Sequence, residues 1–192
     1  NYLLTTMKKR HYLFFILLTI STFIGAETYT IVFNSGNADS SSKTTELTNI
    51  VQSATSNCVN EIVLANNIYR AKPGFGIKGG TASAKGELTL GLNTTYSIST
   101  LTVYAACYAN KTDSTKDYGI TVCDQQVDWI PNHRTDIMPY TLTLNRDINT
   151  ITISANNTKN NRWNVAKIEF ELATPQTQQA SFEMPYVLDL GS

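Results

Sequence analysis

Charged residues are scarce in this sequence. Lysine, arginine, aspartate and glutamate make up 16% of its 192 residues, against roughly 25% in an ordinary soluble domain. Threonine, serine, asparagine and tyrosine are abundant instead, a profile common among secreted β-sandwiches, whose faces are polar but weakly charged. The 15 basic and 15 acidic residues balance, so the chain lacks the basic excess of a nucleic-acid-binding domain. We therefore predict that this domain has no nucleic-acid partner.

Motifs of catalysis and nucleotide binding are also missing. The sequence contains no Gly-x-Ser-x-Gly nucleophile elbow and no Gly-Lys-Ser or Gly-Lys-Thr triplet of a phosphate-binding loop. Residues 74–79 (GFGIKG) do match the dinucleotide fingerprint letter for letter. That fingerprint needs a helix directly after the glycines, whereas residues 81–90 (TASAKGELTL) lead into a strand pattern. We predict that the chain is not an enzyme.

The N-terminus has the pattern of a secretory signal peptide. Met7 is followed by basic residues 8–10 (KKR), an apolar stretch over 12–24 and small residues at 25–26. The apolar stretch is too short to span a membrane comfortably, which favours a cleaved signal over a membrane anchor or a buried helix. We predict that the mature chain begins at Glu27, has no membrane span after signal removal, and is secreted, periplasmic or bound at the cell surface.

The mature chain keeps three cysteines and a small negative charge. Loss of residues 1–26 removes three of the 15 basic residues and none of the 15 acidic ones, so the net charge becomes −3. An odd number of cysteines in an exported protein allows at most one internal disulfide beside a leftover thiol. One interpretation joins Cys107 to Cys123 across a hairpin. The other makes Cys58, Cys107 and Cys123 small buried hydrophobic residues.

Short segments with alternating polarity dominate the mature chain. Such alternation predicts strands that bury one face and expose the other. The predicted strands are 29–33, 61–69, 86–92, 101–107, 118–127, 140–144, 151–154 and 163–172. The segment 118–127 is expected to return antiparallel to 101–107.

One segment has a helical pattern instead. Apolar residues at 47, 50, 51 and 54 follow the i, i+3, i+4, i+7 spacing of an amphipathic helix. Ser41 or Ser42 is a candidate N-cap, and Glu46 lies near the positive end of the helix. We therefore predict an all-β fold, a jelly-roll β-sandwich of about eight antiparallel strands, with one short helix after the first strand.

The domain organisation follows from these patterns. Residues 1–26 are upstream residues and signal peptide, and 27–173 form the β-sandwich domain. Residues 174–192 begin as a linker (TPQTQQ) and end in an apolar segment. That apolar segment is either an added edge strand or the start of a further module.

Five segments together resemble a known family: 29–36 (YTIVFNSG), 44–48 (TTELT), 77–90 (IKGGTASAKGELTL), 101–106 (LTVYAA) and 162–170 (RWNVAKIEF). Their order resembles small galactose-binding-like, jelly-roll domains of secreted Bacteroidetes proteins, and Tyr108 would continue the strand that begins at 101. The resemblance covers about residues 28–172 and implies a non-catalytic accessory role beside a separate enzyme. An insertion at 128–139 departs from the family pattern, and no ligand residue is carried over.

Candidate sugar-binding residues cluster in one loop. Carbohydrate sites combine an aromatic ring, which contacts the apolar face of a sugar, with polar side chains that hydrogen-bond its hydroxyls. Trp129 lies among such polar residues: Asp128, Asn132, His133 and Arg134. We predict that this loop binds ligand and that Tyr108 contributes. The competing interpretation is that Trp129 packs in the core.

Metal ligands are sparse. Zinc would need cysteines or histidines at short spacing, and the sequence has none. A structural calcium ion is more compatible with a jelly roll, because loops and carbonyls supply oxygen ligands. The candidate ligands are Asp39, Glu46 and Glu169, and the alternative is that these three carboxylates are ordinary surface charge. No other cofactor is expected.

Three functions remain to be compared. The first is a non-catalytic exported module that binds glycans and is accessory to a larger secreted or surface protein. The second is a structural spacer or adhesion module that binds a cell-surface protein. The third is a secreted hydrolase, which would need a deep cleft with two close carboxylates or a catalytic role for His133.

Overall fold

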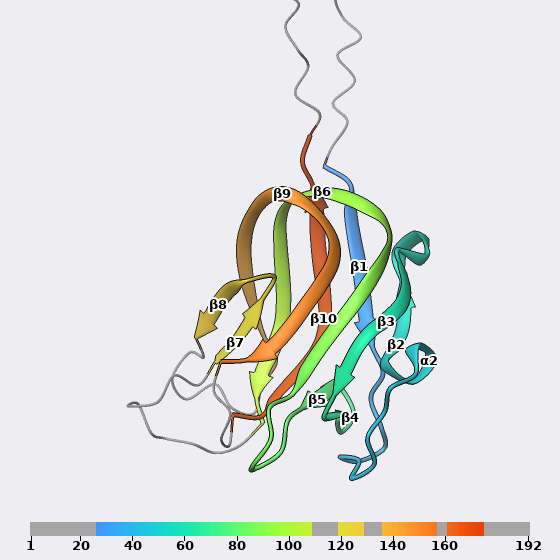
Figure 1. Ribbon diagram of the computed structural model, residues 1–192, viewed down its shortest axis with the longest axis vertical. Helices are drawn as coiled ribbons and strands as arrows, with labels where there is room; N and C mark the ends of the chain where they lie inside the picture. The colour runs from blue at the N-terminus through green and yellow to red at the C-terminus, as the bar shows by residue number, and fades with distance from the viewer. Residues whose placement is uncertain (1–25, 109–118, 129–135, 157–160, 175–192) are drawn as a thin grey trace, which may run out of the picture.

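A computed structural model describes residues 26–108, 119–128, 136–156 and 161–174. Within these ranges the chain is all-β and antiparallel, with one short α-helix and one 3-10 turn after the first strand (Figure 1). The predicted fold class is confirmed. The strands are β1 (Thr28–Phe33), β2 (Val51–Ala54), β3 (Val59–Asn66), β4 (Ile68–Arg70), β5 (Ile77–Gly79), β6 (Glu87–Cys107), β7 (Gly119–Val122), β8 (Gln125–Asp128), β9 (Met138–Ala155) and β10 (Trp163–Leu172), and the helical turns are α2 (Leu47–Ile50) and η1 (Thr55–Asn57).

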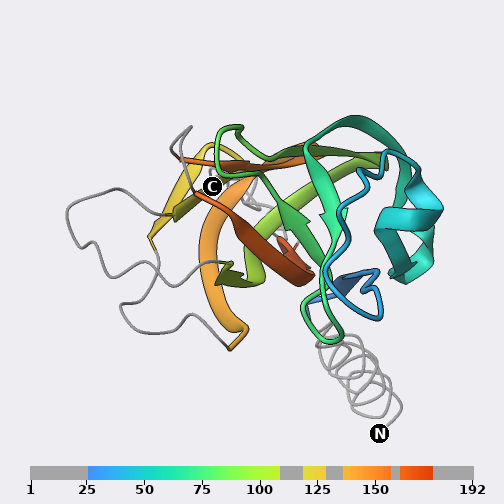
Figure 2. The same ribbon diagram turned by 90° about the horizontal axis from the view of Figure 1, so that it is seen from below.

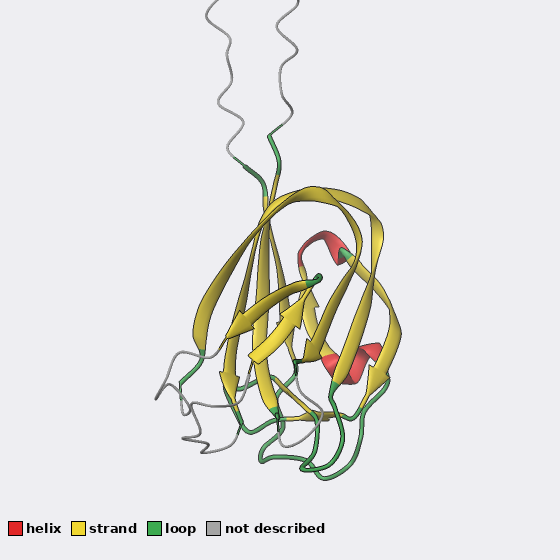
Figure 3. Cartoon of the chain, turned by 60° about the vertical axis from the view of Figure 1, so that its left-hand side comes forward, coloured by secondary structure: helices red, strands yellow, loops and turns green. Residues whose placement is uncertain are grey.

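Two long strands connect the two layers of the sandwich. β6 has 21 residues and β9 has 18, and they pair with each other along most of their length. Both strands bend where their register shifts, at residues 92–95 of β6 and 144–145 of β9, and they form the arch in Figures 1 and 3. On one side of the arch the strand order is β2-β1-β10-β6-β9, and on the other it is β3-β6-β9-β7-β8. The described residues contain no helix long and apolar enough to cross a bilayer.

The core lies between the layers and follows from the alternating pattern. β1 alternates buried and partly exposed residues, and Tyr29, Ile31 and Phe33 face inward. Tyr29 stacks on Phe170 at 5.1 Å between ring centroids, and Tyr96 packs on both rings. Aromatic clusters of this kind bury large apolar areas and stabilise the fold beyond that burial.

The predicted helix is only one turn long. Residues 47–50 form α2, but 51–54 form β2, which pairs with β1. The apolar residues at 51 and 54 therefore lie in a strand and not on a helix face. Pairing with β1 gives their backbone hydrogen-bond partners that a short helix does not provide. Glu46, not Ser41 or Ser42, is the N-cap residue, and it makes no side-chain capping bond.

The segment predicted over 118–127 is a hairpin rather than one strand. β7 and β8 pair with each other, and β7 pairs with β9 instead of β6. The turn residues Cys123 and Asp124 have φ of 46° and 65°. Two central residues of positive φ are typical of the tight turn that joins neighbouring antiparallel strands.

Candidate functional site

A polar face is built where four strands end together. Direct register partners in antiparallel strands point to the same side of a sheet. Tyr69 of β4 is opposite Lys78 of β5, Lys78 is opposite Asn164 of β10, and Asn164 is opposite Ala106 of β6. These four residues therefore share one face of the sheet.

Two further residues extend this row. The backbone N–H of Tyr108 donates to the carbonyl of Arg162 at 2.9 Å, directly beyond the paired ends of β6 and β10. Arg162 Cζ lies 4.6 Å from the centroid of the Tyr108 ring, and Lys78 Nζ lies 4.8 Å from it. Lys78 Nζ is also 5.0 Å from the Tyr69 ring. We call this set of five residues the Tyr108 face: Tyr69, Lys78, Tyr108, Arg162 and Asn164.

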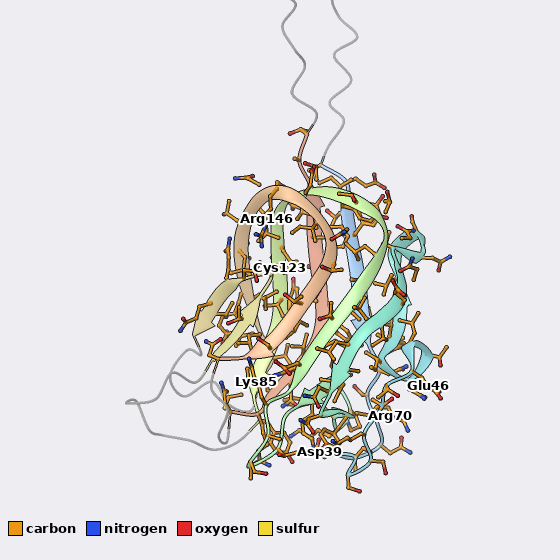
Figure 4. The ribbon with its side chains drawn as sticks, in the orientation of Figure 1. Asp39, Glu46, Arg70, Lys85, Cys123 and Arg146 are labelled. Carbon is orange, nitrogen blue, oxygen red and sulfur yellow. The ribbon has the colours of Figure 1, made fainter. Side chains whose placement is uncertain are left out.

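The loop between β1 and α2 runs beside the Tyr108 face. Its backbone bonds to residues next to β4, as Gly36 N–H donates to Ala71 O at 2.7 Å and Ser40 N–H to Arg70 O at 2.9 Å. The Ser40 carbonyl accepts a hydrogen bond from Lys78 Nζ at 3.2 Å. The labelled side chains of Asp39 and Arg70 lie at this end of the molecule in Figure 4, and Figure 2 views the same end.

Asp39 links this loop to the Tyr108 face. Its Oδ1 accepts the backbone N–H of Lys72 at 2.8 Å, which fixes the carboxylate in the loop. Asp39 also interacts with Tyr108 through its negative charge. Burial raises the pKa of the Tyr108 hydroxyl, and the Asp39 carboxylate raises that pKa further.

Positive charge exceeds negative charge at the Tyr108 face. Burial lowers the pKa of Lys78, and the nearby Arg162 lowers it further, while Asp39 opposes both effects. Lys78 is half-buried, and it shares the Tyr108 ring with a second cation, Arg162. Among the described residues neither cation has an ion pair within 4.0 Å.

Two buried polar atoms of the Tyr108 face lack hydrogen-bond partners in the described part of the chain. Asn164 is 4% exposed, and its Oδ1 accepts no bond. Arg162 Nε is buried and donates none. Nearly all buried polar atoms in folded proteins are paired, so this acceptor and this donor on one face make it a candidate binding site.

The structure places some of the predicted ligand residues at this same end. Tyr108 is central to the face. Asp128 is the last residue of β8, and its backbone pairs with Gly119 of β7. The Gly119 carbonyl accepts a hydrogen bond from Asn161 Nδ2 at 2.7 Å, and Asn161 directly precedes Arg162. Trp129, Asn132, His133 and Arg134 lie outside the described residues.

Sequence reasoning did not single out Lys78, Arg162 or Asn164 as binding residues. The signal was weak: polar residues at 162 and 164 flank Trp163, which is fully buried and opposite Gly79. Many strands begin with a polar, an apolar and a polar residue, so this pattern alone does not indicate a binding site. Only the register of β5 and β10 shows that Lys78 lies beside Arg162 and Asn164.

The three predicted calcium ligands lie on separate elements. Asp39 is in the loop before α2, Glu46 precedes α2 and accepts a bond from Asn49 Nδ2 at 2.9 Å, and Glu169 lies within β10. In the described ranges no three histidine, cysteine, aspartate or glutamate residues are grouped to hold a metal ion. A structural calcium ion remains a prediction from the sequence.

Glu169 belongs to a surface triad. Its Oε1 accepts a hydrogen bond from Lys167 Nζ and its Oε2 from the Tyr104 hydroxyl, each at 2.6 Å. The bond from Lys167, followed by that from Tyr104, lowers the pKa of Glu169 below its ordinary value of 4.5. The triad therefore stabilises the fold above pH 4.5, and this contribution is lost as the pH falls through the folded-state pKa.

We expect Glu169→Gln to lower the melting temperature slightly at neutral pH and not at acidic pH. The effect at about pH 7 should be under about 1 kcal/mol, because the triad is partly exposed to solvent. As the pH falls through the folded-state pKa of Glu169, the wild-type carboxylate becomes protonated, so the difference in melting temperature between wild type and variant should close. Thermal unfolding from neutral to acidic pH measures the difference in melting temperature. A difference that does not change with pH would contradict the stabilising role of the Glu169 carboxylate.

The cysteines are buried thiols rather than a disulfide. Cys107 ends β6 opposite Trp163, whereas the backbone N–H of Cys123, in the β7–β8 turn, donates to Thr152 O. The predicted Cys107–Cys123 bridge is thus not formed, and the interpretation as small buried residues describes all three. Burial raises the pKa of the Cys58 thiol to about 11.

In comparisons with known proteins, no family model, no curated protein and no solved structure matches the chain.

Proposed function

We propose that the chain is a non-catalytic, exported module that binds glycans and is accessory to a larger secreted or surface protein. We place the binding at the Tyr108 face. Sugars present hydroxyl groups that both donate and accept hydrogen bonds, and apolar ring faces that contact aromatic side chains. The Tyr108 face offers donors on Lys78 and Arg162, an amide on Asn164, and a half-buried tyrosine ring.

The observation that carries this proposal is the pair of unpartnered atoms, Asn164 Oδ1 and Arg162 Nε. A face that serves only as a surface would pair these groups or expose them to water, since a buried unsatisfied polar group costs about 1–3 kcal/mol. A hydroxyl of a bound sugar can donate to Asn164 Oδ1 and accept from Arg162 Nε. Asn164 lies in β10, and the backbone bond from Tyr108 holds Arg162 directly before that strand, so the ligand meets groups that are already in position.

The adhesion alternative has its own observation. Val63 and Leu64 are large apolar side chains with exposed fractions of 56% and 46%. They lie in β3, whose described partner is β6 alone, so its other edge carries open backbone groups. An open edge with exposed apolar residues is a surface that a protein strand can extend. This reading predicts binding of a cell-surface protein and no binding of sugars.

A glycan-array screen of the purified chain, with and without calcium, tests the proposal. We expect selective binding of a sugar, and we expect Tyr108→Ala to weaken it at least tenfold, about 1.4 kcal/mol, because a central aromatic contact is lost. Tyr104→Ala is the matched control, since Tyr104 lies in β6, four residues before Tyr108, and Lys167 Nζ lies 4.0 Å from the centroid of its ring. Trp129→Ala in the same assay tests the loop that the sequence predicts.

The outcomes separate the two candidate functions. If Tyr104→Ala and Tyr108→Ala weaken sugar binding equally, the sugar does not bind specifically at the Tyr108 face. If the protein binds no glycan on the array, although its circular dichroism shows an intact β-fold, the glycan-binding proposal is wrong and the adhesion alternative is favoured. Calcium dependence of binding would support the calcium prediction.

A further inference from the structure

We infer that the sugar bound at the Tyr108 face is acidic, with a carboxylate or a sulfate group seated between Lys78 and Arg162. This inference rests on the proposed function, which it deepens by naming the class of glycan. It follows from the balance of charge, from the burial of the cations and from the atoms that they leave unpaired.

The charge balance favours an anion. Lys78 and Arg162 both contact the Tyr108 ring, whereas Asp39 is the one carboxylate that interacts with this group in the described part of the chain. The surrounding charges do not reverse the balance. Arg70 and Lys72 on the neighbouring segment are exposed cations, and Lys85 is neutralised by Glu87 at 3.4 Å.

The two cations are held where they repel each other. The ladder bonds of β5 and β10 fix the backbone at Lys78, and the bond from Tyr108 fixes the backbone at Arg162, directly before β10, so the two backbones keep their positions. Partial burial weakens the screening of this repulsion by water. An anion between the two side chains replaces a repulsive pair by two attractive contacts, and charged pairs in such partly buried sites are stronger than pairs in water.

The unpaired atoms specify an acidic sugar rather than a bare anion. Arg162 Nε is a donor of the planar guanidinium, whose geometry matches the two oxygens of a carboxylate or sulfate. Asn164 Oδ1 is an acceptor, which repels an anion and needs a hydroxyl or amide donor. An anionic group and a neighbouring hydroxyl on one ligand would satisfy both atoms.

Titration calorimetry with paired probes tests this inference. The carboxylate arm compares oligogalacturonate with its methyl ester, and the sulfate arm compares dextran sulfate with dextran. We expect at least one acidic probe to bind at least tenfold more tightly than its neutral counterpart. Arg162→Gln and Lys78→Gln should each weaken that binding by about ten- to hundredfold, the range for lost charge-assisted hydrogen bonds.

Matched variants separate binding from folding and from general charge. Lys85→Gln also removes one positive charge at this end of the molecule, but from a lysine already paired with Glu87, and should change the affinity less than twofold. Arg162→Lys keeps the charge and loses the planar fork, so it should weaken binding without a large change in melting temperature. Thermal unfolding of each variant shows that the protein is folded.

Each contrary result has a distinct meaning. Equal binding of the acidic and neutral probes, lost in Tyr108→Ala but kept in Arg162→Gln, would overturn the acidic ligand and leave the proposed function standing. Absence of binding to every sugar would overturn both. Binding of a single-stranded oligonucleotide as tightly as the best acidic sugar would also overturn the inference, because phosphate charge alone would then explain the affinity.

Discussion

Replacement of Trp163 by alanine should lower the free energy of unfolding by about 3–5 kcal/mol, the range for deletion of a fully buried aromatic side chain. Trp163 is completely buried and is the first residue of β10, opposite Gly79 of β5 and Cys107 of β6. Its indole fills the space behind the Tyr108 face. The variant therefore leaves a cavity between three strands, and neighbouring backbone can close it only in part.

Chemical denaturation with circular dichroism measures this loss. Trp163→Phe is the control, because it keeps most of the apolar volume and removes an indole N–H that has no hydrogen-bond partner in the described part of the chain. Phenylalanine should cost far less than alanine. Similar losses for both variants would show that the energetic role of Trp163 depends on the indole rather than on its volume.

Replacement of Gly79 by alanine should destabilise the fold by about 1–3 kcal/mol through overpacking. A Cβ atom at Gly79 would lie 2.1 Å from two carbon atoms of the Trp163 ring. The ring is held by the core, so β5 must move away from β10. That movement would also displace Lys78, which precedes Gly79, and should therefore weaken ligand binding at the Tyr108 face.

A double-mutant cycle identifies the cause of the Gly79 effect. With Trp163→Ala as background, Gly79→Ala should cost much less, since the clashing ring is gone. Gly74→Ala is the control for backbone strain, because Gly74 has φ of +82° but a Cβ there would meet nothing within 4 Å. If Gly79→Ala costs the same in both backgrounds, its effect does not come from the Trp163 ring.

Strand prediction succeeded where one alternating pattern coincided with one strand. β10 runs from Trp163 to Leu172, the bounds that the sequence predicts. It failed where long strands bend: the predicted strands 86–92 and 101–107 are both parts of β6, because the chain between them continues to pair with β9 around the arch. Local polarity there resembles a loop, and only the neighbouring strand keeps the segment extended.

The candidate site could be predicted only in part, for a related reason. Sequence reasoning predicts that Tyr108 contributes to ligand binding, as an aromatic residue that would continue the strand that begins at 101. Lys78 and Arg162 come from distant segments that meet through the β5–β10 register. Neither residue differs, in its own sequence context, from an ordinary solvated charge, and a contact between them cannot be inferred without knowing which strands are neighbours.

The sequence by itself determined the class of this protein: an all-β, weakly charged chain with a short helix after the first strand. These properties follow from periodicity and composition, which act over a few residues. The tertiary structure decided that Val51 extends into a strand and that Cys107 and Cys123 stay apart. It also placed two cations against the ring of Tyr108. Strand order and register decide these contacts, because they set the distances between residues that are far apart along the chain.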